Sequence, residues 1–246
     1  MKENPDIINV FWTGGLDSTF RLVQSLINTQ ARVQPHYIVR HEDSTGIEID
    51  AMIQIRRAII NKFPDVRTRF LPTIYTNEDL IPRYKETNEI VEELRKIAKV
   101  REQYHILSDY CKAFKVEKIQ LSLVKSPGEM MFIENFSSSP IFKSFEYPNK
   151  DLTKRELYEI SRENQWDDIL LMTSFCRRPI KKVTPCGVCG PCADSTINGM
   201  GFRLPFRSRI KARIQIPFRK YWRKNYLKQD QTRFFRFIKR KFESKF

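Results

Sequence analysis

A glycine-containing loop, Thr13-Gly14-Gly15-Leu16-Asp17-Ser18-Thr19, separates a short apolar run at residues 7–12 from a helical pattern at residues 17–28. The apolar run is typical of a buried strand, and the loop makes the turn into the helix. Two glycines let backbone N–H groups approach a phosphate closely, and the helix N-terminus adds a positive dipole. Because ligands of open α/β sheets bind at the carboxyl ends of strands, the loop is the first candidate site.

Strand and helix patterns alternate along the rest of the chain. Further strands are predicted at residues 33–39, 66–74, 118–124 and 141–147, and further helices at residues 46–63, 88–114 and 153–164. Thr153 and Glu156 have the spacing of a capping box at the start of the last of these helices. The alternation predicts an α/β fold with a doubly wound, mainly parallel sheet.

The polar side chains of the loop indicate more than a turn. Thr13, Ser18 and Thr19 offer hydroxyl groups, whereas Asp17 would repel a bare phosphate. Asp17 therefore favours a helix cap, a contact to Mg²⁺, or both. The loop is neither a Walker sequence nor Gly-x-Gly-x-x-Gly, and the alternative to a phosphate-binding loop is an ordinary strand–turn–helix with a polar cap.

Four of the five cysteines lie close together late in the chain, at Cys176, Cys186, Cys189 and Cys192. Gly187 and Gly190 allow a tight backbone, so that the thiolates can converge on one ion. Four cysteines are typical of a structural, tetrahedral zinc site. An iron–sulfur cluster and free thiols are the alternatives. Cys111 stands apart among apolar residues at helical spacing, and we expect it to be a packing residue.

The three histidines form no recognisable catalytic arrangement. They are His36, in a predicted strand, His41, just after that strand, and His105, in a predicted helix. We expect each to have a structural or surface role rather than a catalytic one.

Charge divides the chain into two parts. The whole chain has 44 Lys and Arg against 29 Asp and Glu, a net charge of +15. Residues 203–246 hold 16 basic and two acidic side chains, a net of +14, which leaves +1 for residues 1–202. We therefore predict a nearly neutral domain at residues 1–202, including a zinc loop at residues 174–200, and a basic, aromatic extension at residues 203–246.

The extension allows three interpretations. Phe234, Phe235, Ile238 and Phe242 fall on one face of a helix surrounded by basic residues, which suits an anionic membrane surface. Interleaved aromatic and basic residues could instead hold RNA. The third interpretation is a segment that packs on the domain or on a partner. No apolar run approaches the ~18 residues of a membrane span, and the polar start of the chain is unlike a signal peptide.

The loop resembles the Ser-Gly-Gly-x-Asp-Ser loop of the PP-loop, or N-type, ATP pyrophosphatases, with Thr13 in place of the usual serine. Together with the late cysteines it resembles the 7-cyano-7-deazaguanine synthase (QueC) family, over about residues 6–202. Thr153-Lys154-Arg155-Glu156 is similar to a Thr-Lys-x-Glu segment of that family, and Thr173-Ser174-Phe175-Cys176 to its entry into the zinc site. Residues 100–104 and 126–132 depart from the family's pattern.

The resemblance implies an adenine nucleotide alpha hydrolase-like, Rossmann-like domain and a set of site residues. It assigns ATP binding, with Mg²⁺, to Thr13, Gly14, Gly15, Leu16, Asp17, Ser18 and Thr19. It assigns catalytic roles to Asp17, Ser18 and Lys154, although Lys154 could equally be a solvated residue of a helix's first turn. It assigns zinc to the four clustered cysteines.

The implied activity is that of an ATP-dependent carbon–nitrogen ligase. Such an enzyme activates the carboxylate of 7-carboxy-7-deazaguanine, adds ammonia to give an amide and dehydrates the amide to a nitrile, a step of queuosine precursor biosynthesis. We expect a cytoplasmic protein, peripheral on a membrane if the extension binds lipid, with a homodimer as a compatible assembly. The alternatives are a PP-loop enzyme that adenylates a tRNA base and a non-catalytic nucleotide-binding module tethered by its extension.

Overall fold

The first strand, β1 (Ile7–Phe11), lies at the centre of a five-stranded sheet in the computed structural model. Strands β2 (Arg32–Val39) and β3 (Ile74–Asn77) follow on one side, and β4 (Ile119–Gln120) and β5 (Phe145–Glu146) on the other. The order is β3-β2-β1-β4-β5, and all neighbours run parallel. The structure describes residues 6–96, 102–125, 139–180 and 184–217.

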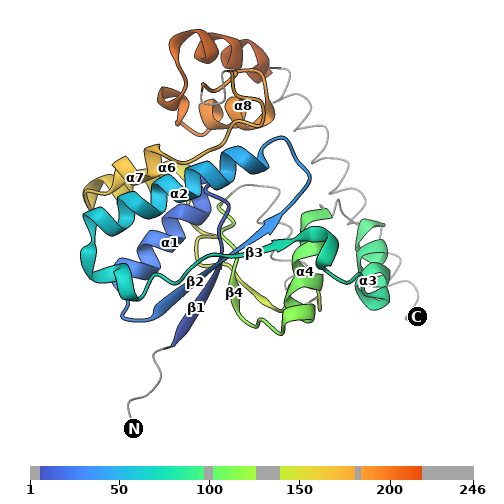
Figure 1. Cartoon of the computed structure of the whole chain (residues 1–246). Helices are drawn as coiled ribbons and strands as arrows, with labels where there is room; N and C mark the ends of the chain where they lie inside the picture. The colour runs from blue at the N-terminus through green and yellow to red at the C-terminus, as the bar shows by residue number, and fades with distance from the viewer. Residues whose placement is uncertain (1–5, 97–101, 126–138, 181–183, 218–246) are drawn as a thin grey trace, which may run out of the picture.

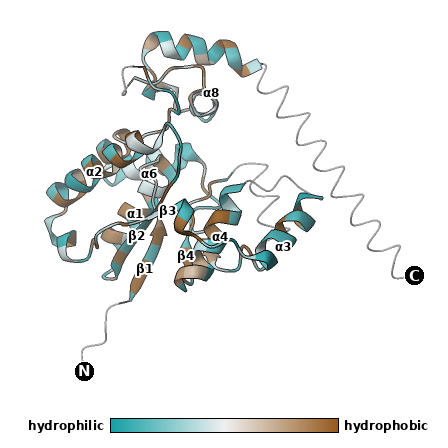
Figure 2. Cartoon of the chain, turned by 45° about the vertical axis from the view of Figure 1, so that its right-hand side comes forward, coloured by the Kyte–Doolittle hydropathy of each residue, from teal (hydrophilic) through white to brown (hydrophobic). Residues whose placement is uncertain are grey.

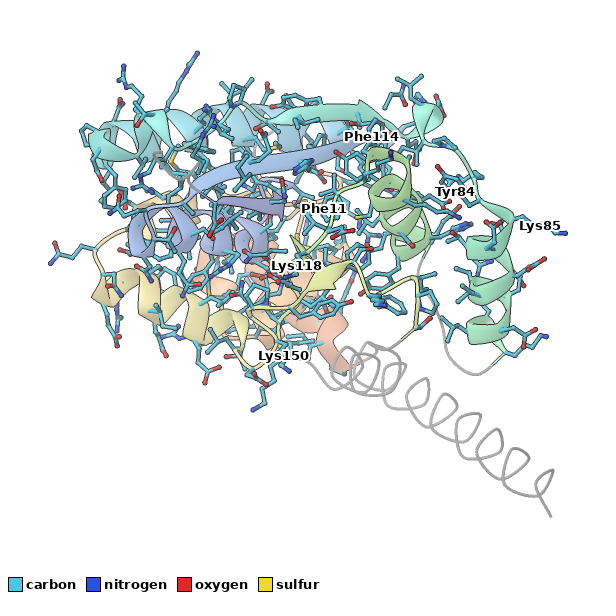
Figure 3. The ribbon with its side chains drawn as sticks, turned by 90° about the horizontal axis from the view of Figure 1, so that it is seen from below. Phe11, Tyr84, Lys85, Phe114, Lys118 and Lys150 are labelled. Atoms are coloured by element: carbon cyan, nitrogen blue, oxygen red, sulfur yellow. The ribbon has the colours of Figure 1, made fainter. Side chains whose placement is uncertain are left out.

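Helices cover both faces of the sheet (Figure 1). One face packs against α1 (Leu16–Asn28), α2 (Thr45–Lys62), α6 (Lys154–Glu163) and α7 (Asp167–Leu171), and the other against α3 (Lys85–Arg95) and α4 (Glu102–Phe114). Side chains of β1 alternate between the two cores, with Val10 in the first and Phe11 in the second. Phe11 packs edge to face against Tyr110 of α4, with ring centroids 5.6 Å apart. Figure 3 labels Phe11 in the sheet and Phe114, the last residue of α4. The predicted parallel α/β fold is confirmed.

The strand order places the glycine loop, which follows β1, at the point where the order of the strands reverses. From β1 the chain moves outward to β2 and β3, and then crosses back to β4 and β5 on the opposite side. The order therefore reverses between β1 and β4. In open α/β sheets the crevice outside the carboxyl ends of strands at such a reversal is where ligands bind.

The capping box predicted at the start of α6 is confirmed. Thr153 Oγ1 accepts a hydrogen bond from the backbone N–H of Glu156 at 3.2 Å, and Glu156 Oε2 accepts one from the backbone N–H of Thr153 at 2.7 Å. The two bonds satisfy N–H groups that the first turn of a helix leaves without partners. They fix where α6 begins, and so fix the position of Lys154, its first residue.

The strand predicted at residues 66–74 is wrong. Pro64–Thr68 forms a 3-10 helix, and Phe70 then makes a single bridge to Val33. Pro72 follows and cannot donate a backbone hydrogen bond to a neighbouring strand. Regular pairing with β2 begins only at Ile74, where β3 starts.

Three further boundaries differ from prediction. The helix predicted over residues 88–114 is two helices, α3 and α4, which pack against each other; α3 ends at Arg95. Lys118 has a φ of 53°, outside the range of strands, so β4 starts after it. Residues 139–144 make turns rather than extended chain, which leaves β5 with two residues.

A separate small core holds the cysteines at one end of the molecule. We call residues 174–180 and 184–217 the cysteine lobe; it contains α8 (Gly190–Ile197), the 3-10 turn Gly201–Arg203 and a helix at residues 206–217. Leu204 and Ala212 are buried against Cys176, Cys186 and Cys192. Packing therefore continues past residue 202, where charge alone suggests a boundary.

Within the described residues, no helix is long and apolar enough to cross a membrane. The helical face predicted at residues 234–242 lies outside the described residues, as do residues 126–132.

Candidate functional site

The glycine loop is held by its own hydroxyl groups. Ser18 Oγ lies 3.3 Å from the backbone N of Thr13, which donates to it, and 3.4 Å from Thr13 Oγ1. Ser18 Oγ also donates to the carbonyl oxygen of Gly15 at 3.3 Å. Thr19 is fully buried, and its Oγ1 accepts a hydrogen bond from the Trp12 indole at 3.0 Å. Thr13 and Ser18 are thus brought together at the loop, whereas Thr19 and the buried Leu16 lie in the core beneath it.

Gly14 occupies a place that no other residue fits without strain. Its φ is +67°, and a Cβ there would lie 3.0 Å from both the carbonyl oxygen of Glu48 and Met52 Cγ of α2. Its carbonyl oxygen accepts a hydrogen bond from the backbone N of Ser174 at 3.0 Å. The loop is therefore clamped between α2 and the segment that enters the cysteine lobe.

This clamp gives a first prediction. We expect Gly14→Ala to lower the free energy of unfolding by about 1–3 kcal/mol, because a side chain at positive φ is strained and the site has no room for it. Gly46→Ala is the matched control, since Gly46 lies in the first turn of α2 and a Cβ there would meet nothing within 4 Å. Urea unfolding followed by circular dichroism measures both. Equal stability of the two variants would contradict the clamp.

Asp17 joins the loop to α6. Asp17 Oδ2 lies 2.9 Å from Lys154 Nζ, and both side chains are partly buried. Asp17 Oδ1 is buried and has no hydrogen-bond partner within the described part of the chain. Asn149, 1% exposed, approaches the same residue through Nδ2, which lies 3.5 Å from the backbone oxygen of Asp17, while its Oδ1 has no partner there. Two oxygen acceptors near the loop are thus left without a donor.

Arg203 is a residue of this region that sequence reasoning missed. One guanidinium nitrogen donates to the carbonyl oxygen of Thr173 at 2.6 Å and to Thr173 Oγ1 at 2.8 Å, and the group stacks over Phe175 at 4.5 Å. Burial lowers the pKa of Arg203 to about 10, while the nearby charge of Asp17 raises it. Arg203 therefore remains protonated at neutral pH. No local motif marks it, because it begins the stretch counted as the basic extension.

The charges around the loop suit an anion. Lys154 and Arg203 both interact electrostatically with Asp17, so two cations accompany one carboxylate. The backbone N–H groups at the start of α1 add positive potential at the same place. A site with this balance at the carboxyl edge of the sheet attracts phosphate or carboxylate groups.

The histidines lie outside this arrangement. His36 is buried and bonded through its ring nitrogens to Tyr110 Oη at 2.7 Å and Asn9 Oδ1 at 2.9 Å. Burial lowers its pKa to about 4, so the ring is neutral. His41 is exposed and pairs with Asp79 at 2.7 Å, and its pKa is raised by that hydrogen bond. His105 lies 3.3 Å from Asp109 in α4. The positions of the three histidines agree with the structural and surface roles that we expected for these residues.

The four late cysteines converge on one point. The Sγ atoms of Cys176, Cys186, Cys189 and Cys192 all lie within 4.8 Å of one another, with 3.4 Å between those of Cys189 and Cys192. Four thiolates around a tetrahedral zinc ion at a bond length of ~2.3 Å would have their sulfurs about 3.8 Å apart. The spacing fits a single ion better than a cluster in which each thiolate binds a different iron.

The surroundings of the sulfurs support metal binding. Backbone N–H groups point at two of them: Cys186 N lies 3.2 Å from Cys176 Sγ, and Val188 N lies 3.4 Å from Cys186 Sγ. Such donors stabilise thiolates and orient them. Burial raises the pKa of Cys176, while the sulfur–sulfur hydrogen bond lowers the pKa of Cys189 to about 4 and raises that of Cys192. A divalent cation would let all four ionise together.

The two sites are joined by a short segment. Ser174 bonds to the glycine loop, and Cys176 follows two residues later as the first of the clustered cysteines. Arg203 returns from the other end of the lobe to the same segment at Thr173. The lobe therefore contacts the glycine loop through Ser174, and Arg203 holds the preceding residue, Thr173.

A scan against protein-family models and a search of curated proteins found no match to this chain. The class is given by the fold and the cysteines: a nucleotide-binding-like, parallel α/β domain with a four-cysteine cluster that could hold a zinc ion. The roles of individual residues of the glycine loop, and of Lys154, stay predictions.

Proposed function

We propose that the chain is an ATP-dependent enzyme that binds the phosphates of ATP at the glycine loop and activates a carboxylate. The observation that carries the proposal is the loop itself: Gly14, Asp17 and Ser18 lie at the reversal of strand order, with Lys154 paired to Asp17. The match to the Ser-Gly-Gly-x-Asp-Ser pattern adds chemical detail that the fold alone lacks.

Each residue has a role that its surroundings support. The N–H groups at the start of α1 would bind phosphate oxygens, and Gly14 and Gly15 keep that approach free of side chains. Asp17, with one oxygen lacking a hydrogen-bond donor, would take a Mg²⁺ ion that accompanies ATP. Lys154 would then be released from Asp17 to pair with phosphate.

The reaction follows from the weak reactivity of a carboxylate. A carboxylate oxygen attacks the α-phosphorus of ATP, the bond to the β-phosphate oxygen breaks, and pyrophosphate leaves with that electron pair. Positive charge near the leaving pyrophosphate lowers the barrier, and Lys154 and Arg203 lie close enough to the loop to supply it. Ammonia then displaces AMP from the activated carboxyl carbon to give an amide.

The resemblance to 7-cyano-7-deazaguanine synthases points to 7-carboxy-7-deazaguanine as the carboxylate. The resemblance rests on the glycine loop and Lys154, which would bind ATP, and on the segment that ends at Cys176, which leads into the cysteine cluster. The cysteines would serve structure, because four protein ligands close a tetrahedral site to substrate.

The proposal is tested by pyrophosphate release. The purified chain, ATP, Mg²⁺ and ammonia are combined with 7-carboxy-7-deazaguanine or a control carboxylate, and pyrophosphate and AMP are measured. We expect release with the deazaguanine and a loss of about 100-fold or more in Asp17→Asn, because a metal-binding and charge-positioning group is removed. Asp168→Asn is the matched control, since Asp168 lies in α7 and pairs with Lys62 on the surface.

Other outcomes identify the alternatives. Pyrophosphate release that requires tRNA would replace the ligase by an RNA-modifying enzyme of the same superfamily. Binding of ATP without turnover under any of these conditions would leave a nucleotide-binding module. Full activity of Asp17→Asn would remove the glycine loop from the mechanism.

A further inference from the structure

The helix at residues 206–217 has an apolar face that nothing in the described chain covers. Its inner side packs into the cysteine lobe through the buried Ser208 and Ala212. On its outer side Phe206 is 74% exposed, Ile210 44% and Ile214 64%. The helix lies at the end of the lobe away from the sheet (Figure 1).

The exposed apolar residues form one row, which we call the outer stripe: Phe206, Ile210 and Ile214. They are four residues apart, so they lie one above another on the helix surface. Helix geometry places Arg207 and Lys211 along one border of the stripe and Arg209 and Arg213 along the other. Figure 2 shows hydrophobic and hydrophilic residues interspersed along this helix.

Charge identifies the kind of surface that this face fits. Residues 203–217 contain five basic side chains and no acidic one, and the net charge of residues 203–246 is +14. A partner must therefore be anionic as well as able to cover aliphatic side chains. An apolar stripe bordered by cations on both sides is the arrangement of helices that lie in the interface of an anionic bilayer.

We propose that the helix at residues 206–217 docks the chain on an anionic lipid surface, with the outer stripe in the acyl boundary and the bordering cations at the headgroups. RNA would neutralise the arginines, but it offers nothing that covers Ile210 and Ile214. The stripe is aliphatic at two of its three positions, whereas stacking on bases needs aromatic rings.

A cavity beside the helix supports headgroup binding. It has a volume of about 250 Å³ and is lined by Arg209 and Arg213 together with Thr196, Gly199, Gly201 and Phe202. Arg209 Nε is buried and has no acceptor within the described chain. A lipid phosphate in this cavity would lie beside two arginine side chains of the same helix.

The test uses sedimentation of the full chain with vesicles of phosphatidylcholine containing about 30% phosphatidylglycerol, and with phosphatidylcholine alone. We expect binding to the anionic vesicles only. Ile210→Ser with Ile214→Ser should weaken it by about tenfold or more, because the transfer of two aliphatic side chains is lost. Each of Arg207→Gln and Lys211→Gln should weaken it about fivefold.

The matched control is Ile53→Ser, which removes an aliphatic side chain of similar exposure, 42%, from α2. It should bind vesicles like the unchanged chain. Circular dichroism and metal content confirm that each variant is folded. Undiminished vesicle binding by the double isoleucine variant would overturn the proposal, and so would equal binding to uncharged vesicles. Binding to RNA oligonucleotides without binding to vesicles would overturn it too. The outcome is independent of whether the chain activates a carboxylate with ATP.

Discussion

Replacement of Cys192 by alanine is expected to abolish metal binding and to unfold the cysteine lobe. Cys192 is fully buried in the first turn of α8, and its sulfur lies 3.4 Å from that of Cys189. The lobe has only a small apolar core, to which Leu204 and Ala212 contribute beside the cysteines. For structural zinc sites the binding free energy, about 10–16 kcal/mol, is largely the folding free energy of the domain. Loss of one ligand should therefore cost most of the lobe's stability.

The measurement is zinc content by atomic absorption together with limited proteolysis. The unchanged chain should hold about one zinc ion and resist cleavage within the lobe. Cys192→Ala should lose the ion and be cut between residues 174 and 217.

The matched control is Cys111→Ala. Cys111 belongs to α4 and is buried in the core between that helix and the sheet, and burial raises its pKa to about 12, so it stays a thiol. This variant should keep its zinc and lose only about 1 kcal/mol of stability to the smaller side chain. Retention of metal by Cys192→Ala, or its loss from Cys111→Ala, would contradict the assignment of the ligands.

Unfolding of the lobe should also remove contacts that hold the glycine loop. Ser174 holds the carbonyl group of Gly14, and Arg203 holds Thr173, so both contacts depend on an ordered lobe. The cysteines thus affect the glycine loop without touching it.

The sequence predicts the centre of the fold well because the signals for it are local patterns. The apolar run before the loop, the glycines of the turn and the helical pattern after it are close together in the chain, and so are the two residues of the α6 capping box. The four cysteines are recognisable for the same reason, since three of them lie within seven residues.

Long-range contacts explain what the sequence could not predict. Asn149 lies beside Asp17 although 132 positions separate them, and Arg203 bonds to Thr173 across 30 positions. Neither has a recognisable local pattern. Phe70 is buried and bridges to β2, so it looks like part of a strand, but Pro72 delays regular pairing.

The predicted boundary at residue 202 rests on charge, and charge does not report packing. The arginines and the lysine of residues 203–217 give that stretch the appearance of a separate extension. Small residues on the inner side of the helix, Ser208 and Ala212, allow it to pack closely on the cysteines. The helix comes closest to the cysteine-bearing loop at Gly187, and a substitution of that glycine tests the contact.

We expect Gly187→Ala to lower stability more than Gly14→Ala does. The φ of Gly187 is +76°, and a Cβ would lie 2.2 Å from the carbonyl oxygen and 2.7 Å from the Cα of Ser208. Positive φ alone costs about 1–3 kcal/mol for a side chain, and the overlap adds to it. The helix at residues 206–217 would have to move away from the cysteines. Thermal unfolding and the rate of zinc transfer to a chelator should both reveal the change.

Gly201→Ala is the matched control within the same lobe. A Cβ there would lie 3.4 Å from Thr196 Cγ2, an ordinary contact, and the φ of Gly201 is not positive. This variant should release zinc at the rate of the unchanged chain. Equal rates for Gly187→Ala would show that the helix does not rest on the cysteine loop.

A second substitution separates the backbone contact from the side-chain contact. Ser208 Oγ donates to the carbonyl oxygen of Pro185 at 2.6 Å, so Ser208→Ala should lower stability by about 1 kcal/mol. The atoms that Gly187→Ala would strike belong to the backbone of Ser208, so Ser208→Gly should not rescue it. If Ser208→Gly does not rescue Gly187→Ala, the start of the basic extension belongs to the cysteine lobe. A chain ending at residue 202 should then lose its zinc as readily as Cys192→Ala.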